Sequence, residues 1–267
     1  MKNTLIAGCT ILAVYIIIAI FAPVIAPFDP SIDRGSPFLP PSAQHILGTN
    51  DIGRDIFSEL LIGTRLSLLV GFTAAVISLV IGGIIGGLSG WFGGAIDGIL
   101  SAITTFVITI PFFPIVIILS AIIGGGTLTP ALILGLLDWP ETARILRAQT
   151  ISLKSRQYIL DIKAMGAGSG YILSRHVSRD LLPFCAYRFI LSFRNVVLAE
   201  ATLSFLGLGS PLAISFGNML FFAQARHAFL TGTWIWWALP PGLALVGLVF
   251  GLLLISLYFE KVVDPRL

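Results

Sequence analysis

Three polar residues inside a long apolar run are the first candidates for chemistry in this chain: Arg194, Asn195 and Glu200. A charged side chain is expensive within a lipid bilayer, so such residues usually face a cavity or a partner. Arg194 and Glu200 are six residues apart, which places them on different faces of one helix. Two interpretations stay open: charges with a function in a pore, or an interhelical ion pair that fixes packing.

A second set of charges precedes another apolar run. Asp51 and Asp55 flank Arg54 and could form a carboxylate site. The alternative, which we favour, is local charge pairing and capping of a turn. The three histidines, His45, His176 and His227, fall in separate segments, so no metal cluster is expected.

The sequence contains none of the common catalytic motifs. It has no G-x-x-x-x-G-K-[ST] phosphate loop, no G-x-S-x-G nucleophile elbow and no H-E-x-x-H zinc helix. We therefore predict no catalytic residues, no cofactor, no ATP-binding site of the phosphate-loop type and no enzymatic activity of this chain.

The composition indicates a membrane protein. The 267 residues are 56% hydrophobic and only 11% charged, and the mean hydropathy is +0.98. A soluble domain carries about 25% charged residues. Backbone polar groups must be satisfied internally in lipid, so helices are expected. The basic residues do not form an aromatic-interleaved face, so nucleic acid is not an expected partner.

Six apolar runs predict six membrane-spanning helices. A spanning helix needs about 20 apolar residues. The first run is too long for the core of a cleaved signal peptide, so an anchor is favoured over that alternative. The predicted spans are residues 5–26, 66–91, 99–123, 128–146, 184–208 and 238–259.

Small residues, prolines and charges give these spans local character. Glycines four residues apart, at 82 and 86 and at 83 and 87, predict close helix approach. Pro111, Pro114 and Pro140 predict kinks. Asp138, Glu141 and Arg144 are expected near the interface or facing the bundle, and Arg188 is expected to extend to the cytoplasmic interface.

The distribution of basic residues predicts the topology. Seven of the sixteen Lys and Arg residues lie between Arg144 and Pro183, which marks that segment as a cytoplasmic loop. With six spans and both termini in the cytoplasm, eleven basic residues lie inside and four outside. The segments Phe28–Arg65 and Gly209–Thr233 are then external, and residues 260–267 form a cytoplasmic tail.

The basic loop contains a short amphipathic pattern. Tyr158, Ile162 and Met165 recur at helical spacing and predict one apolar stripe. Gly166 follows directly and permits a backbone turn that a residue with a side chain would resist. The stripe predicts docking onto a partner; the alternative is a helix that lies on the membrane surface.

Four pieces of the chain together carry a family resemblance. They are HILGTNDIGRDIFSELLIGTRLSL (45–68), DWPETARILRAQTISLKSRQYI (138–159), KAMGAG (163–168) and EATLSFLGLG (200–209), and the terminal DPRL also fits. The sequence resembles the permease subunits of bacterial and archaeal ABC importers. It is most similar to the second permease type of the peptide/nickel (dipeptide and oligopeptide) group, and the resemblance runs through most of the chain.

The resemblance implies a type I ABC importer fold and a coupling helix, the EAA motif, that docks onto an ATPase subunit. By match, the coupling residues are Tyr158, Lys163, Ala164, Met165, Gly166 and Ala167, and Ile162 joins them as part of the apolar stripe. The sequence departs from the motif at Leu160–Asp161–Ile162 and at Ser178–Arg179. The domains expected are an anchor with an external loop (1–65), a permease core (66–259) with a coupling loop at about 147–183, and the tail (260–267).

The implied function is one half of the pore of an ATP-driven, binding-protein-dependent importer in a prokaryotic cell membrane. The implied partners are a second homologous permease, cytoplasmic ATPases and an extracytoplasmic solute-binding protein. Peptides, nickel and other small solutes all remain possible cargo. Two other classes stay open: a secondary transporter or channel that needs no ATPase, and a structural subunit of an energy-transducing membrane complex.

Overall fold

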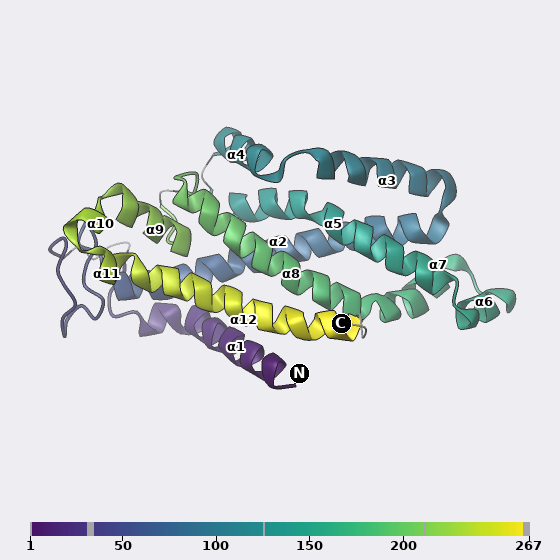
Figure 1. Ribbon diagram of the computed structural model, residues 1–267, viewed down its shortest axis with the longest axis horizontal. Coiled ribbons are helices and arrows are strands. Elements are labelled where there is room, and N and C mark those ends of the chain that lie inside the picture. Colours follow the sequence, from purple (N-terminus) through teal and green to yellow (C-terminus); the bar gives the residue numbers. More distant parts are fainter. Residues whose placement is uncertain (1, 31–34, 125, 211, 264–267) are drawn as a thin grey trace.

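The computed structural model describes residues 2–30, 35–124, 126–210 and 212–263, which fold into helices joined by loops (Figure 1). Long helices run roughly along the long axis of the molecule: α1 (Lys2–Ile25), α2 (Ile56–Phe92), α5 (Thr129–Lys154), α8 (Ser178–Phe205) and α12 (Leu239–Val263). No β-strand forms within these described ranges. The prediction of an all-α membrane protein agrees with this architecture.

The shorter helices gather in three places. A bent pair, α3 (Gly94–Thr109) and α4 (Phe112–Ile123), lies along one side of α5. One end of the molecule, called the α9 end below, carries α9 (Phe216–Ala225), α10 (Ala228–Thr231) and α11 (Trp234–Trp237). The opposite end, called the α6 end, carries α6 (Gln157–Ala164), α7 (Ser169–Ile172) and the π-helical turn η1 (Leu173–Val177).

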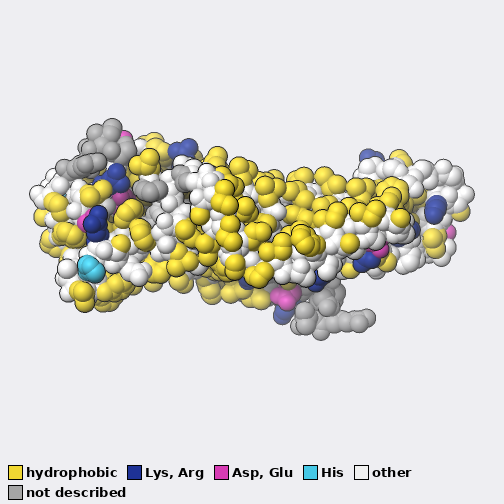
Figure 2. Space-filling view, turned by 90° about the horizontal axis from the view of Figure 1, so that it is seen from above, with side chains coloured by type: hydrophobic (Ala, Val, Ile, Leu, Met, Phe, Trp, Pro, Cys, Tyr) yellow, Lys and Arg dark blue, Asp and Glu magenta, His cyan; other side chains and the backbone are white. Residues whose placement is uncertain are grey.

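On the face shown in Figure 2, apolar side chains cover most of the middle, and charged side chains gather towards the two ends and at one edge. Four helical stretches within the described residues are long and apolar enough to cross a bilayer: Lys2–Ile25, Ile56–Phe92, Ser169–Phe205 and Trp234–Val263. The α3–α4 pair adds a fifth if it counts as one span. The predicted span 128–146 forms part of α5, which is helical but carries Asp138, Glu141 and Arg144 within its apolar run.

Two predicted boundaries were wrong. Helix α2 begins at Ile56 rather than at residue 66, because the Asp55 side chain accepts the backbone N–H of Ser58 and caps the helix. The expected turn over residues 92–98 shrinks to Gly93, since α3 already begins at Gly94. Gly93 and Gly94 have φ of 68° and 55°, which lets the chain reverse within so few residues.

The prolines act differently from one another. Helices α3 and α4 meet at an 83° bend, with Pro111 at the junction, which confirms a kink there. Pro114 lies in the first turn of α4, where a missing N–H has no helical partner to lose. Pro140 lies within α5, which continues through it to Lys154.

Helices α2 and α5 pack closely because glycines on α2 face α5. A Cβ atom at Gly86 would lie 2.5 Å from the Ala143 carbonyl oxygen, and one at Gly82 would lie 2.6 Å from Thr142 Cβ. Gly87 has no atom within 4 Å of such a position. The glycine pair 82/86 therefore mediates the predicted close approach, whereas Gly87 of the second pair does not.

Helices α1 and α12 pack antiparallel. Gly8, near the start of α1, approaches the Gly251 carbonyl oxygen, and Tyr15 Oη donates to the Ala244 carbonyl oxygen at 2.6 Å. These two contacts pair residue 8 with residue 251 and residue 15 with residue 244. The first residues of α1 therefore lie beside the last residues of α12. Residues 264–267 of the predicted tail lie outside the described part of the chain.

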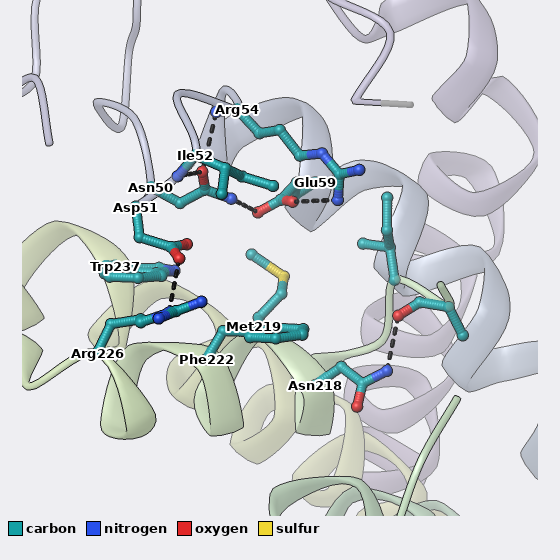
Figure 3. A pocket seen from close by; sticks show the side chains of 12 residues that line it. Asn50, Asp51, Ile52, Arg54, Glu59, Asn218, Met219, Phe222, Arg226 and Trp237 are labelled. Carbon is teal, nitrogen blue, oxygen red and sulfur yellow. Dashed lines mark hydrogen bonds and ion pairs between the residues drawn. The ribbon is translucent and has the colours of Figure 1, made fainter. Parts of the chain in front are cut away.

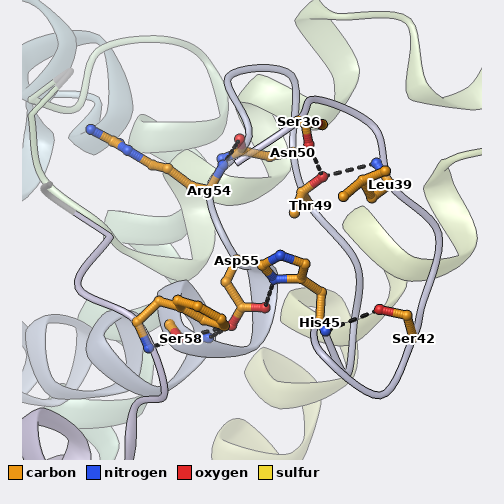
Figure 4. A network of polar contacts seen from close by, with 10 residues as sticks. Ser36, Leu39, Ser42, His45, Thr49, Asn50, Arg54, Asp55 and Ser58 are labelled. Carbon is orange, nitrogen blue, oxygen red and sulfur yellow. Dashed lines mark hydrogen bonds and ion pairs between the residues drawn. The ribbon is translucent and has the colours of Figure 1, made fainter. Parts of the chain in front are cut away.

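A buried polar network fixes the loop before α2 (Figure 4). His45 Nδ1 lies 2.9 Å from Asp55 Oδ1, while the Ser58 backbone N–H and hydroxyl both donate to Asp55 Oδ2 at 2.8 Å. Because the Ser58 hydroxyl is bonded to the carboxylate and not to the imidazole, this is not the arrangement of an activated serine. For Asp55, capping is confirmed over a carboxylate site.

Candidate coupling segment and membrane cavity

The predicted coupling segment is a short helix with a defined stop. Helix α6 ends at Ala164, and Gly166 follows with φ of 87°, in the left-handed region. The Gly166 N–H donates to the Lys163 carbonyl oxygen, and the Ala167 N–H donates to that of Ile162. This pair of bonds is the Schellman motif, which satisfies the last carbonyl groups of a helix. Gly166 thus has the turning role predicted for it.

The apolar residues of α6 divide between two faces, which corrects the prediction of one stripe. Ile159 is buried, and Ile162 packs beside Ala167 against the same apolar cluster. Tyr158 and Met165 are 36% and 78% exposed. The inner face thus holds α6 on the body of the protein, while Tyr158 and Met165 are presented outward together with the exposed Lys163 and Ala164.

Polar contacts tie α6 to the start of α8. The Tyr158 hydroxyl donates to Asp180 Oδ2 at 2.5 Å, and Arg156 lies 3.8 Å from the same oxygen. Partial burial and the hydrogen bond to Asp180 raise the pKa of Tyr158 to about 12, so the hydroxyl stays protonated and continues to donate at neutral pH. The outward face of α6 is therefore oriented relative to a long helix.

The inner face of α6 packs into an apolar cluster to which several long helices contribute. Its apolar cluster contains side chains from α2, α5, α7, η1 and α8: Trp91, Leu146, Leu153, Ile172, Val177 and Leu181. Lys154 Nζ donates to the Trp91 carbonyl oxygen at 2.6 Å, which joins the ends of α5 and α2. A displacement of α6 would thus disturb a cluster that three long helices, α2, α5 and α8, share.

An ion pair joins the bent pair to the same region. Arg147 on α5 donates to both carboxylate oxygens of Asp97 on α3, at 2.5 and 2.7 Å. The hydroxyls of Ser89 and Ser101 also donate to Asp97. Two-pronged pairs of this kind fix geometry as well as adding energy, so α3 is held to the half of α5 that continues towards α6.

A cavity of about 350 Å³ lies where α3 bends into α4. Helix α5 contributes Leu137, Asp138 and Glu141 to its lining, and α8 contributes Asn195 and Thr202. Broken helices are tolerated at membrane depth where they line a cavity. The bend therefore places a recess beside two acidic residues that the sequence marked only as facing the bundle or the interface.

Hydroxyl groups hold Asp138 in place. Ser78 Oγ on α2 donates to Asp138 Oδ2 at 2.7 Å, and Ser192 Oγ on α8 donates to the same oxygen at 2.5 Å. Sequence reasoning missed both serines. Isolated hydroxyl residues are common in membrane helices, and only their shared position around Asp138 distinguishes these two.

The three predicted polar residues of α8 separate. Asn195 lines the cavity, and Arg194 Nη2 donates to Asn195 Oδ1 at 3.3 Å. Glu200 is buried and accepts from Ser204 Oγ at 2.8 Å, while its Oε2 has no partner among the described residues. The ion pairs found in the described part of the chain include neither Arg194 nor Glu200, so the packing alternative is not supported.

Arg188 does not reach the interface as predicted. It is 3% exposed, and its guanidinium donates to Thr142 Oγ1 and lies 3.5 Å from Glu141 Oε2. Polar partners on α5 offset the cost of burying this charge. The sequence placed Arg188 near the cytoplasmic end of a span, but the position of α5 could not be inferred from it.

A second, smaller cavity of about 160 Å³ lies at the α9 end (Figure 3). Asn50 Nδ2 donates to Glu59 Oε2 at 3.0 Å, with Arg54 3.7 Å from the same carboxylate. Across the cavity, Arg226 Nε lies 2.9 Å from Asp51 Oδ2. Asp51 therefore joins the loop before α2 to the segment after α9, which corrects the prediction of local charge pairing beside Arg54. Both segments are external in the predicted topology.

Comparison with known proteins identifies the family. Residues 78–267 match the family described as binding-protein-dependent transport system inner membrane component. Residues 2–41 match the N-terminal transmembrane domain of oligopeptide transport permease C. Together the two matches cover most of the chain.

Relatives with transport names align over nearly the whole chain. A dipeptide transport system permease protein of Alkalihalophilus pseudofirmus is 32% identical over 100% of this chain and 87% of its own length. An oligopeptide transport system permease protein of Bacillus subtilis is 32% identical over 97% and 85%. A di/tripeptide transport system permease protein of Pseudomonas aeruginosa is 30% identical over 97% and 87%. The chain therefore belongs to the family of binding-protein-dependent transport system inner membrane components, as a permease subunit of the peptide ABC importer type.

Proposed function

We propose that this chain forms one half of the translocation pore of an ATP-driven, binding-protein-dependent importer of peptides. A second homologous permease supplies the other half of the pore. Separate cytoplasmic ATPase subunits hydrolyse ATP, and an extracytoplasmic solute-binding protein delivers the cargo. The complex lies in the inner or plasma membrane of a prokaryote. The names of the relatives support peptides as the cargo rather than nickel.

The observation that carries this proposal is the two-faced geometry of α6. Tyr158 and Met165 are presented outward, while Ile159 and Ile162 pack inward against side chains of several long helices. A partner that binds the outer face of α6 can therefore displace the side chains of its inner face. The docking residues in this account are Tyr158, Lys163, Ala164, Met165 and the Gly166–Ala167 turn, with Ile162 as part of the inner anchor.

The same geometry supports a six-span topology with both termini in the cytoplasm. If α6 is cytoplasmic, α8 starts on that side, and α5 ends there. In this topology α5, the fourth span along the chain, brings the total to six. Its charged side chains face the bundle rather than lipid. Residues 1–65 provide the anchor, an external loop and the first turns of α2, residues 66–259 the rest of the permease core, and residues 260–267 the tail.

An importer moves its cargo by alternating between two packings of the bundle. ATP binding draws the coupling helices of the two permeases together, and the long helices shift between inward-open and outward-open states. Such coupling requires an element with two discrete arrangements. The bend between α3 and α4, together with α5 and α8 beside it, is the region where this change would open or close the path.

The alternative is a transporter or channel that works without an ATPase. Reconstitution into liposomes separates the two functions. The proposal predicts that uptake of labelled di- and tripeptides needs this chain, its partner permease, the ATPases and ATP together, with binding protein outside. Peptide uptake by this chain alone, at the same rate with or without ATP, would establish the alternative.

A further inference from the structure

The cavity at the α3–α4 bend carries chemistry that the coupling role of α6 does not use. We propose, resting on the importer function above, that this cavity binds the protonated α-amino group of a translocated peptide, with Asp138 and Glu141 as its carboxylate partners. The binding protein selects the cargo outside the membrane; the cavity would hold it within this subunit during passage.

The size and position of the cavity suit a peptide end. Its volume of about 350 Å³ falls within the range of small-ligand pockets. Its walls come from both arms of the bent pair, from α5 and from α8, so it lies between elements that a change of packing would move. Apolar side chains including Phe112, Phe113 and Leu137 form much of the lining and can accept varied side chains.

The charge of the lining selects a cation. Among the described residues that line the cavity, Asp138 and Glu141 are the charged ones, and neither Lys, Arg nor His is among them. Arg188 lies behind Glu141, at 3.5 Å, and is itself buried against Thr142. A second guanidinium, that of Arg194, also lies outside the lining and donates to Asn195 Oδ1. The charged groups within the lining itself are therefore the two carboxylates, which favour a positively charged ligand.

Asp138 is already oriented for such a ligand. The Ser78 and Ser192 hydroxyls both donate to Oδ2, one from α2 and one from α8. This arrangement fixes the carboxylate plane and leaves Oδ1 to accept from an ammonium group. Binding to a pre-organised acceptor loses less conformational entropy than binding to a free side chain. Glu141, with a side chain 65% exposed, can then adjust to the ligand.

The ligand class follows from the polar groups beside the acids. Asn195 and Thr202 also line the cavity and can donate to, or accept from, peptide bonds. A divalent metal fits less well, because the described residues contain no group of three or more His, Cys, Asp or Glu able to hold one. An ammonium group followed by an amide matches both the charge and the neighbouring donors.

The test compares free and N-acetylated peptides in the assembled importer. Proteoliposomes contain the second permease, the ATPases and the binding protein together with this chain as wild type, Glu141→Gln, Asn195→Asp or Glu260→Gln. The probes are mixtures of di-, tri- and tetra-alanine, free or N-acetylated. The binding protein is the same in every preparation, so a change in the free-to-acetylated uptake ratio between variants comes from this subunit.

Removing the Glu141 charge should lower the ratio by about two- to fivefold, the range of an exposed ion pair. Asn195→Asp adds an acid to the lining and should raise the ratio. Glu260→Gln removes a carboxylate near the end of α12, outside the cavity, and should leave the ratio unchanged. Opposite shifts in the two cavity variants exclude a general loss of folding as the cause.

The outcomes separate this inference from the importer function. ATP-dependent uptake with one ratio in all four preparations overturns the inference and leaves the importer function intact. Uptake of Ni²⁺ that depends on Glu141, without an effect on the peptide ratio, also overturns it. Absence of ATP-dependent peptide uptake in the wild type rejects the importer function and this inference with it.

Discussion

At the scale of the residue, the backbone conformation of Gly166 positions the outward face of α6. Its φ of 87° closes the Schellman motif, so α6 ends there and Met165 points outward. The sequence predicted this turn because glycine followed a helical apolar pattern. It could not predict that Ile162 packs inward, since the face of a short helix depends on what its neighbours cover. The buried cluster that decides it includes side chains of other helices, such as Trp91 on α2 and Leu181 on α8.

Two neighbouring glycines allow a matched test of this turn. Gly166→Ala places a side chain at positive φ, which costs about 1 kcal/mol, whereas Gly168 has φ of −69° and accepts alanine without strain. Neither position has an atom within 4 Å of the added Cβ. We expect Gly166→Ala to lower the peptide taken up per ATP hydrolysed about fivefold, and Gly168→Ala to leave it unchanged. Equal coupling in both variants would contradict the role of the turn.

At the scale of the element, the helices were easier to predict than their ends and contacts. The apolar runs predicted the long helices, and Pro111 predicted the bend. The start of α2 was missed because Glu59 and Arg65 resemble loop residues in composition, although Asp55 caps a helix that includes them. The cavity was beyond sequence reasoning. It depends on an 83° angle and on hydroxyl groups from two helices that converge on Asp138.

The packing of α2 against α5 gives a prediction with an internal control. Valine at Gly86 would meet the Ala143 carbonyl oxygen, and overpacking of this kind costs about 1–3 kcal/mol. Valine at Gly87, the next residue, enters open space. Thermal unfolding of the detergent-solubilised chain should therefore begin at a lower temperature for Gly86→Val than for the wild type, with Gly87→Val close to the wild type. A lower unfolding temperature for Gly87→Val than for Gly86→Val would contradict this packing of α2 against α5.

At the scale of the whole molecule, the cavity proposed to bind the peptide amino group lies apart from the proposed coupling surface on α6. The cavity lies within the bundle, beside α5 and α8, and the same two helices flank the loop that contains α6. A displacement of α6 and the binding of a ligand in the cavity therefore both affect α5 and α8. This sharing is what a transporter needs if cargo and ATP are to influence one another.

The central claim is that the exposed face of α6 contacts a separate ATPase in the cytoplasm. The most direct measurement is cross-linking of Met165→Cys, in a Cys9→Ser and Cys185→Ser background, to the co-expressed ATPase subunit. Leu212→Cys, which is 93% exposed near the α9 end, is the control. We predict an adduct between position 165 and the ATPase, identified by mass spectrometry, and none from position 212. Labelling of position 165 by an impermeant maleimide added outside intact cells, with no ATPase adduct, would contradict the account.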